Sequence, residues 1–279
     1  MKRQVNWAQI LVECKSFIME QIHPLLKTVD QPQPDLGIGA GGDPMRQVDL
    51  VAEKAIVSTL KRNGISFTLI SEESGVTEYG DTANDCYVTT DPIDGTTNLS
   101  RRIPFYATSI AVSTKPILGT VYAGLVADLF HGVGYIAQRG KGAYRERKKI
   151  TSSQNVSLED AVIGLDLNSY KVKTLIPQLN DLVQRTKHIR HFGANALELC
   201  YVADGTTDAF IDIRGKLRAT DIAAAWLVLN EAGAIMTTPN GITLNAKLDP
   251  KQKVKFVASG NRKIHETILD LIKPEKEAQ

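Results

Sequence analysis

Two aspartates, Asp91 and Asp94, are the residues of this chain whose type and spacing best suit chemistry. They stand in the run Asp91-Pro92-Ile93-Asp94-Gly95-Thr96-Thr97-Asn98. Their carboxylates and the Ile93 carbonyl between them offer three hard oxygens to one small region. Such oxygens suit Mg²⁺, Mn²⁺ or Ca²⁺ better than zinc. The alternative is an ordinary Asp-Gly turn between two strands, which needs no metal.

The residues that follow the acids favour a phosphate-binding site over a plain turn. Thr96, Thr97 and Asn98 are small and polar and come directly after a glycine. Hydroxyl residues with free backbone N–H groups suit phosphate oxygens. Ligands for a metal and for a phosphate would therefore meet in one short stretch.

A predicted strand leads into this stretch. Residues 86–90 are rich in branched and aromatic side chains, a composition typical of strands. Pro92 cannot donate to a sheet and biases Asp91 towards an extended backbone, so we expect the strand to end at Asp91. Asp94 would then lie across a tight turn that Gly95 closes.

Three further acids stand at the ends of predicted elements. They are needed because a divalent ion takes about six oxygens, more than two aspartates supply. Glu72 follows a strand predicted over 66–70, and pairing of neighbouring strands would bring it beside Asp91. Asp221 begins an alanine-rich helix, and Asp49 begins the helix before that strand. Taken singly, each has a simpler explanation, since Asp221 is a good first-turn helix acid and Glu72 a common kind of surface charge.

The acids taken together resemble a known family. The run from Asp91 to Asn98 is similar, residue for residue, to the metal-binding signature of the inositol monophosphatase superfamily. Glu72-Glu73 before it, and Asp221-Ile222-Ala223-Ala224 with the stretch 230–233 after it, follow in the family's order and approximate spacing. The similarity covers nearly the whole chain, from about Asp49 to the last helix.

Two segments resemble the archaeal inositol monophosphatase/fructose-1,6-bisphosphatase branch in particular. One is the glycine-rich loop that ends in Asp43, and the other is the basic stretch 214–218. Thr220 is a departure from the wider family, which often has Trp before the acid of the second lobe. The branch resemblance therefore leaves two substrate classes open, inositol phosphates and fructose bisphosphate.

The resemblance implies two to three Mg²⁺ ions, with Mn²⁺ as an alternative. Glu72, Asp91 and the Ile93 carbonyl would hold one ion. Asp91, Asp94 and Asp221 would hold the second. Glu72 would also share a third, looser ion. Four acids brought together with a dianionic phosphate need such cations to balance their charge.

The resemblance also assigns residues to catalysis and to the substrate. Asp49 and Thr96, beside Glu72, match the residues that position and activate the attacking water. The substrate residues are Asp94, Gly95, Thr96, Gly193, Ala194, Asn195, Asp212 and Arg214. Of these, Asp212 would accept sugar hydroxyls. Arg214, Lys216 and Arg218 alternate along an extended stretch, so at least one of them could meet a second phosphate. The stretch 214–218 could equally be a solvated basic edge.

The function that the resemblance implies is a Mg²⁺-dependent phosphomonoesterase. A metal-activated water would attack the phosphorus of inositol 1-phosphate or fructose 1,6-bisphosphate in line, without a phosphoenzyme. One alternative is a phosphatase for 3′-phosphoadenosine 5′-phosphate. A second is a phosphatase of the haloacid-dehalogenase type, whose two acids are separated by one residue rather than two. A third is a non-catalytic sugar-phosphate-binding module.

The predicted elements change in kind near residues 148–157. A first lobe over about 1–149 has helices and then an antiparallel meander, and a second over about 150–272 alternates strands with helices. Both belong to one predicted domain over 1–272, with a polar tail over 273–279. The resemblance implies a layered α-β-α-β-α sugar-phosphatase fold, α+β or α/β in class.

The glycine-rich segment 37–42 matches the pattern G-x-G-x-x-G. It follows a proline-rich linker rather than a strand, and Pro44 comes soon after, which argues against a dinucleotide site. So many glycines leave the backbone free to move. We expect a mobile loop that brings Asp43 towards the site.

The composition is typical of a globular protein of ordinary kind. The chain has 279 residues, 43% hydrophobic and 23% charged, with a net charge of +2. This balance gives no reason to expect nucleic acid or a membrane as a partner. Three scattered cysteines and the lack of a recognisable signal peptide suit a reducing cytoplasm. We expect a cytoplasmic homodimer or homotetramer that binds a small sugar or polyol phosphate.

Overall fold

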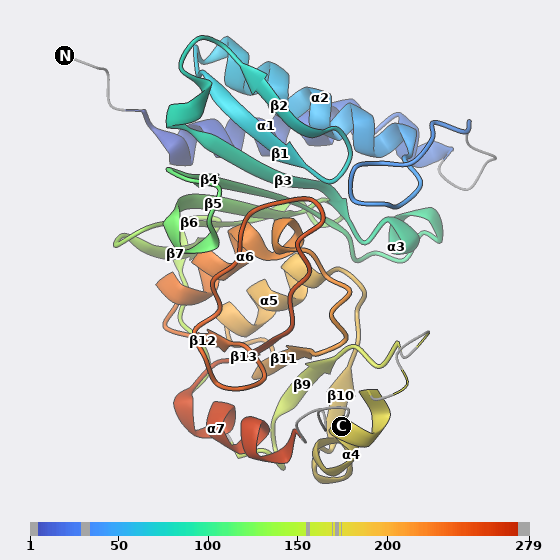
Figure 1. Ribbon diagram of the computed structural model, residues 1–279, viewed down its shortest axis with the longest axis vertical. Helices are drawn as coiled ribbons and strands as arrows, with labels where there is room; N and C mark the ends of the chain where they lie inside the picture. The colour runs from blue at the N-terminus through green and yellow to red at the C-terminus, as the bar shows by residue number, and fades with distance from the viewer. Residues whose placement is uncertain are drawn as a thin grey trace, which may run out of the picture.

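The computed structural model describes residues 5–28, 34–154, 157–168, 170, 173 and 175–272, which form five stacked layers (Figure 1). Helices α1 (Trp7–Ile22) and α2 (Gln47–Arg62) cover one face of an eight-stranded sheet. Helices α5 (Asn195–Ala203) and α6 (Ala219–Glu231) lie between that sheet and a five-stranded sheet. Helices α4 (Leu175–Arg185) and α7 (Arg262–Leu271) cover the far face of the second sheet. The predicted α-β-α-β-α layering is confirmed.

The first sheet has the strand order β2-β1-β3-β4-β5-β6-β7-β8. Its strands are β1 (Phe67–Ser71), β2 (Gly75–Tyr79), β3 (Tyr87–Asp94), β4 (Ala107–Ser113), β5 (Val121–Asp128), β6 (Val133–Gln138), β7 (Gly142–Arg145) and β8 (Lys148–Lys149). β1 and β3 are parallel, and the other neighbouring pairs are antiparallel. The predicted antiparallel meander therefore extends from β3 to β8.

Strand β3 continues to Asp94, so the expectation that it ends at Asp91 is wrong. Its pairing with β4 is irregular between Asp91 and Asp94, where Pro92 lies. An irregularity of this kind tolerates a residue that cannot donate to the ladder. The turn comes instead at Gly95, whose φ of 86° lies in the left-handed region that favours glycine. The short helix α3 (Thr96–Ser100) begins directly after it.

The second sheet is mixed and has the order β10-β9-β11-β13-β12. Its strands are β9 (Val162–Leu165), β10 (His188–Arg190), β11 (Ala209–Asp212), β12 (Ile235–Thr237) and β13 (Phe256–Ser259). Three short 3₁₀ helices lie in the first half of the chain: η1 (Leu25–Lys27), η2 (Ala83–Asp85) and η3 (Leu118–Thr120). The predicted mixed second lobe agrees with this sheet. The helix predicted over 170–183 corresponds to α4, and residues 169, 171, 172 and 174 lie outside the described residues, as does the tail 273–279.

Small residues let α6 approach the first sheet closely. Ala223, Ala224 and Ala225 are completely buried, and α6 contacts β3, β4 and β5. A Cβ added to Gly124 on β5 would lie 3.2 Å from the Cα of Ala224, so a larger residue would push the helix away. This close approach brings the first turn of α6, with Asp221, to the acids of the first sheet.

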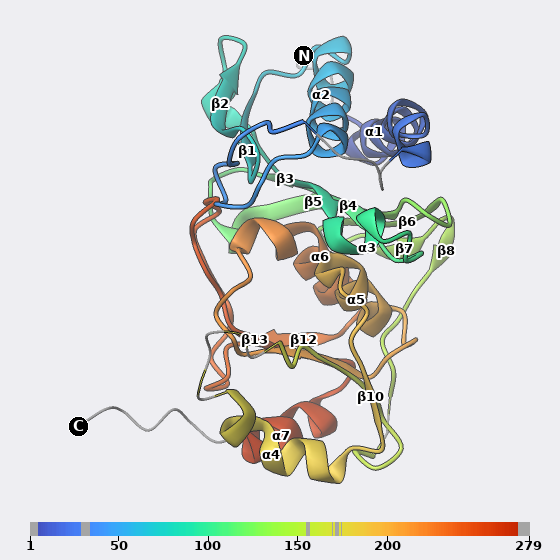
Figure 2. The same cartoon turned by 90° about the vertical axis from the view of Figure 1, so that its right-hand side faces the viewer.

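The glycine-rich segment forms a loop held against the end of β1. The Ala40 N–H donates to the Glu73 carbonyl at 3.0 Å, and the Gly41 N–H donates to the Glu72 carbonyl at 2.6 Å. Figure 2 shows this loop, in blue, beside β1. The loop is thus paired with the residues that follow β1, and its predicted mobility stays a prediction.

The apolar side chains are gathered in three cores that fill the spaces between the layers. One lies between the first sheet and helices α1 and α2, one between the two sheets around α5 and α6, and one between the second sheet and helices α4 and α7. Across the described ranges, no helix combines the length and the apolar character that crossing a membrane requires.

Candidate metal and phosphate site

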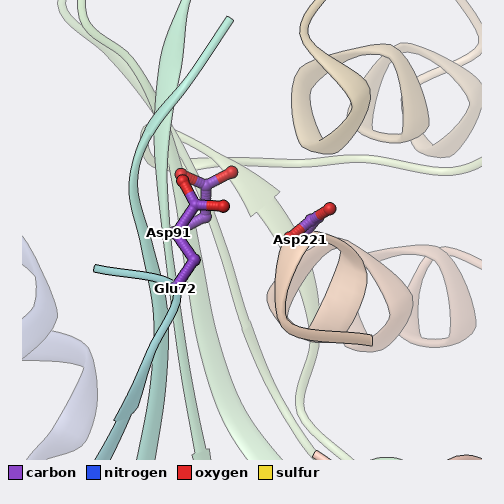
Figure 3. A group of neighbouring side chains, drawn as sticks. All are labelled: Glu72, Asp91 and Asp221. Carbon is purple, nitrogen blue, oxygen red and sulfur yellow. The ribbon is translucent and has the colours of Figure 1, made fainter. Parts of the chain in front are cut away.

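Three carboxylates from three separate elements meet at one place, as the sequence predicts. Glu72 directly follows β1, Asp91 lies on β3, and Asp221 is in the first turn of α6. One oxygen of each lies within 4.8 Å of the others. Figure 3 shows Glu72 and Asp91 side by side, with Asp221 on the adjoining end of α6. The parallel pairing of the strands explains the first contact, because Ser71 is opposite Thr90 and the next residues are these two acids.

Burial raises the pKa of all three acids, and repulsion from neighbouring acids adds to the rise at Glu72 and Asp91. The pKa of Glu72 is raised to about 9, first by burial and then by the charge of Asp221. Burial, followed by the charges of Glu72, Asp94 and Asp221, raises the pKa of Asp91 well above its usual value. Burial also raises the pKa of Asp221, although the Arg218 charge opposes the shift. Additional positive charge would therefore stabilise the ionised cluster.

The donor set fits a hard divalent cation. Asp91 is only 4% exposed, and its Oδ1 is buried with no hydrogen-bond partner among the described residues. Buried carboxylate oxygens are normally hydrogen-bonded, paired or bound to a metal. A site of carboxylates without histidine or cysteine suits Mg²⁺ or Mn²⁺ better than zinc. Glu72, Asp91 and Asp221 together are able to hold such an ion.

Asp94 lies three residues further along β3 and lines the same cavity. Its Oδ2 accepts a hydrogen bond of 2.7 Å from the backbone N–H of Ala196 in the first turn of α5. Burial raises the pKa of Asp94 to about 7, although backbone hydrogen bonds from Ala196 and its neighbours oppose the rise. Ile93 before it also lines the cavity, and its carbonyl accepts a hydrogen bond of 3.0 Å from the Thr96 hydroxyl. Asp94 thus joins the acid cluster to the start of α5.

Asp49 and Thr96, the residues expected to act on water, line this cavity as well. Asp49 lies in the first turn of α2, where its Oδ2 accepts the backbone N–H of Arg46 at 3.1 Å and so caps the helix. Its Oδ1 is buried and finds no hydrogen-bond partner in the described part of the chain. Burial raises the pKa of Asp49 to about 7. One carboxylate oxygen therefore remains free for proton transfer.

The cavity has a volume of about 900 Å³ and is lined from both halves of the chain. Asp166, His191 and Lys253 also line it and were not expected from the sequence. Asp166 directly follows β9 and His191 directly follows β10, just as Glu72 follows β1. The same reasoning about polar residues at strand ends would have found these two. Lys253 lies outside the named elements and gave no such signal.

The expected substrate residues divide into two groups. Gly193 and Asn195 line the cavity. Ala194 between them is completely buried. Asp212 is also completely buried, and both of its carboxylate oxygens accept hydrogen bonds from Arg214. Asp212 is not among the residues that line the cavity, so its contact with sugar hydroxyls stays a prediction.

Arg214 is held between two carboxylates and does not belong to a solvated edge. Its Nη1 lies 2.5 Å from Asp166 Oδ2, its Nε lies 3.0 Å from Asp212 Oδ1, and its side chain is 6% exposed. Lys216 is half-buried, and its Nζ donates to the Tyr170 carbonyl at 2.6 Å. The basic residues of this stretch therefore have different partners and different exposure.

Comparison with known proteins identifies the family. The sequence profile of the inositol monophosphatase family matches residues 9–277. The chain belongs to this family. The fructose-1,6-bisphosphatase/inositol-1-monophosphatase of Methanothermobacter thermautotrophicus is 35% identical over 275 residues, which are 95% of this chain and 96% of that protein. The crystal structure of an inositol monophosphatase–fructose 1,6-bisphosphatase matches with a TM-score of 0.84 at 32% identity, over 96% of this chain and 100% of that one.

A second kind of relative is named for a different activity. The bifunctional NADP phosphatase/NAD kinase of Methanococcus maripaludis is 34% identical over 251 residues, which are 84% of this chain and 44% of that protein. Inositol monophosphatases are metal-dependent phosphatases, so the chain is a phosphoric monoester hydrolase of this family. The predicted resemblance to the archaeal branch is confirmed, and the haloacid-dehalogenase and non-catalytic alternatives are overturned.

Proposed function

We propose that this protein is a Mg²⁺-dependent phosphatase for a small sugar or polyol phosphate, with inositol 1-phosphate and fructose 1,6-bisphosphate as the first candidates. The observation that carries the proposal is the meeting of Glu72, Asp91 and Asp221 within 4.8 Å, together with the unpartnered Oδ1 of Asp91 among the described residues. Acids so close together and so deeply buried need cations before a dianionic ester can join them.

The residues proposed to hold the cations are the side chains of Glu72, Asp91, Asp94 and Asp221 and the Ile93 carbonyl. When bound there, Mg²⁺ would offset the charge of acids and phosphate and lower the pKa of a water molecule. The family resemblance favours two ions shared among these five donors, and Mn²⁺ is a suitable replacement because it prefers the same oxygen donors.

The chain's own groups would orient the reacting water and the phosphate. The free Oδ1 of Asp49 would accept a proton from the water, which suits a carboxyl group whose pKa is raised to about 7. The Thr96 hydroxyl, fixed by its bond to the Ile93 carbonyl, would hold the water from a second side. The backbone N–H groups of Gly95 and Thr96 would bind phosphate oxygens. The water would then attack in line with the leaving group and leave no phosphoenzyme.

The alcohol part of the substrate would extend towards the second sheet. His191, Gly193 and Asn195 line that end of the cavity and offer polar groups to sugar hydroxyls. Arg214 and Lys216 both line the cavity, and a second phosphate would meet Lys216 because Asp166 and Asp212 already pair with Arg214. These contacts favour a compact polyol ester.

A panel of phosphate esters assayed for phosphate release tests this proposal. It contains inositol 1-phosphate, fructose 1,6-bisphosphate, 3′-phosphoadenosine 5′-phosphate and NADP⁺, the last because one group of relatives carries the name NADP phosphatase. We expect release from at least one polyol ester with Mg²⁺, and none with EDTA or in Asp91→Asn. Preference for either nucleotide would replace the sugar proposal with the nucleotide alternative. Metal-independent release would contradict the mechanism.

Assembly and location are also proposed on the resemblance. We expect a homodimer or homotetramer, which light scattering of the purified protein measures. Cys14, Cys86 and Cys200 are free thiols in the structure, which supports a cytoplasmic location. A monomer at micromolar concentration would contradict the assembly proposal.

A further inference from the structure

Glu198 is a buried acid that the proposed mechanism does not use. It lies in the first turn of α5, and only 2% of its surface is exposed. Its Oε1 accepts hydrogen bonds from two successive backbone N–H groups, those of Phe192 at 3.1 Å and Gly193 at 2.9 Å. Its Oε2 is buried and has no hydrogen-bond partner among the described residues. The side chain therefore reaches back from α5 and holds the entry segment, residues 192–195, which leads into the helix.

The entry segment packs against the phosphate turn, residues 94–98. Asn98 Nδ2 donates to the Phe192 carbonyl at 2.6 Å. A Cβ added to Gly95 would lie 3.2 Å from the Gly193 carbonyl oxygen, so the two backbones are in close contact. Gly193 itself has a φ of 85°, in the left-handed region that favours glycine. The path of the entry segment is thus fixed by Glu198 on one side and by the phosphate turn on the other.

The first turn of α5 is capped by a residue from outside the helix. Ala194, the N-cap residue, has no polar side chain that could accept a backbone N–H. Asp94 Oδ2 takes that place, because it accepts the Ala196 N–H at 2.7 Å. Asp94 is a proposed metal ligand, whereas Asn195 lines the end of the cavity proposed for the sugar. The start of α5 therefore relates the sugar end of the cavity to the metal and phosphate end.

We propose that Glu198 is a positioning residue, which sets the entry segment against the phosphate turn so that a polyol ester meets both at once. The inference rests on the function proposed above. Glu198 is not among the residues that line the cavity, so it acts through the backbone of Phe192 and Gly193. A displacement of about 1 Å can cost about 100-fold in rate when a substrate is held at two ends. Glu198 thereby favours esters whose hydroxyls contact the entry segment over esters that offer only a phosphate.

The test compares two kinds of ester in the full chain with Mg²⁺. One is a polyol ester, inositol 1-phosphate or fructose 1,6-bisphosphate, and the other is p-nitrophenyl phosphate, which has no hydroxyls for the entry segment. We expect Glu198→Ala to lower kcat/KM for the polyol ester at least about tenfold more than for p-nitrophenyl phosphate. Burial raises the pKa of Glu198 to about 8, so the neutral side chain of Glu198→Gln is a close substitute. It keeps an acceptor oxygen and should keep the wild-type preference.

Asp208→Ala is the matched control. Asp208 is a buried acid whose Oδ2 accepts the backbone N–H of Val162 at 2.9 Å, and it is not among the residues that line the cavity. Its removal also deletes a buried acceptor of a backbone N–H, so we expect a lower melting temperature. The preference between the two esters should stay as in the wild type.

The outcomes separate this role from a merely structural one. Loss by the same factor with both esters in Glu198→Ala would overturn the proposal, as would an equal change of preference in Asp208→Ala. If Glu198→Ala does not fold, Glu198→Asp decides, because its shorter side chain withdraws the acceptor from the two N–H groups and should shift the preference in the same direction.

Amide hydrogen exchange, followed by NMR without substrate, tests the contacts themselves. Exchange at Gly193 and Ala196 should be at least about tenfold faster in Glu198→Ala than in the wild type. Unchanged exchange at both would overturn the positioning role. A wild type that hydrolyses neither kind of ester would contradict the proposed function, while these exchange rates would still decide whether Glu198 holds the entry segment.

Discussion

The substitution Asp91→Asn should stabilise the metal-free protein while it removes metal binding. It deletes one charge with little change in shape. Asp91 is buried, one of its oxygens is unpartnered among the described residues, and its carboxylate faces Glu72, Asp94 and Asp221. Its pKa is raised by burial first and by those charges next. In the absence of metal, the charge of Asp91 therefore destabilises the folded protein.

The magnitude follows from the spacing of the acids. Two full charges 4.8 Å apart repel by about 3–4 kcal/mol at an effective dielectric constant of about 20. The raised pKa values mean that the cluster is partly protonated at neutral pH, so only part of this repulsion is present. We expect Asp91→Asn to gain about 1–2 kcal/mol in the free energy of unfolding. In a chain of this length that corresponds to a melting temperature about 2–6 °C higher.

The assay is thermal unfolding in EDTA and in Mg²⁺, with Asp212→Asn as the matched control. Asp212 is as deeply buried as Asp91, but both of its oxygens are bonded to Arg214. Removing its charge should lower the free energy of unfolding by about 3 kcal/mol, because it breaks a buried pair. The change from Asp to Asn should therefore raise the free energy of unfolding at position 91 and lower it at position 212.

Two results would refute this reasoning. If Asp91→Asn melts below the wild type in EDTA, the acids do not repel one another as the structure indicates. If Mg²⁺ raises the melting temperature of Asp91→Asn as much as that of the wild type, Asp91 is not a metal ligand. We expect Mg²⁺ to stabilise the wild type and to leave the variant almost unchanged.

Three further predictions follow from the same contacts. Asp94→Asn should keep the fold, judged by circular dichroism, but lose at least about 100-fold in phosphate release, and near-normal turnover would remove Asp94 from the site. Folding raises the pKa of Glu72 from its usual 4.5 to about 9, so the contribution of Glu72 to stability in EDTA should be largest below pH 4.5 and should be lost as the pH rises towards 9. A contribution that grows over this range, measured as the difference in melting temperature between the wild type and Glu72→Gln, would contradict the sign. Asn98 Nδ2 donates to the carbonyls of Phe105 and Phe192. Asn98→Ala should therefore lower the free energy of unfolding in urea by about 1–3 kcal/mol, and an unchanged value would show that these two hydrogen bonds do not stabilise the fold.

Much of the acid cluster could be predicted because its members stand at the ends of elements. Glu72 follows a strand whose pairing with β3 brings it beside Asp91, and neighbouring strands commonly pair. The end of β3 was predicted three residues too early, because an irregular pairing accommodates Pro92. Strand β2 was missed, since its residues are only partly buried and lack a strong apolar pattern.

Two features of the site could not be predicted from sequence, the position of Asp221 and the partners of the long basic side chains. The position of Asp221 depends on the close packing of α6 against Gly124, which spacing along the chain does not show. Arg218 and Glu72 are 146 positions apart, and Arg214 and Lys216 resemble Arg218 in sequence but have different partners. Which of these cations turns towards the acids is decided by tertiary packing.

The central claim is that acids from three parts of the chain share divalent cations, and anomalous X-ray diffraction from crystals grown with Mn²⁺ tests it most directly. We predict an anomalous peak within bonding distance of the carboxylates of Glu72, Asp91 and Asp221. A Mn²⁺-saturated crystal with no peak among these carboxylates would contradict the account.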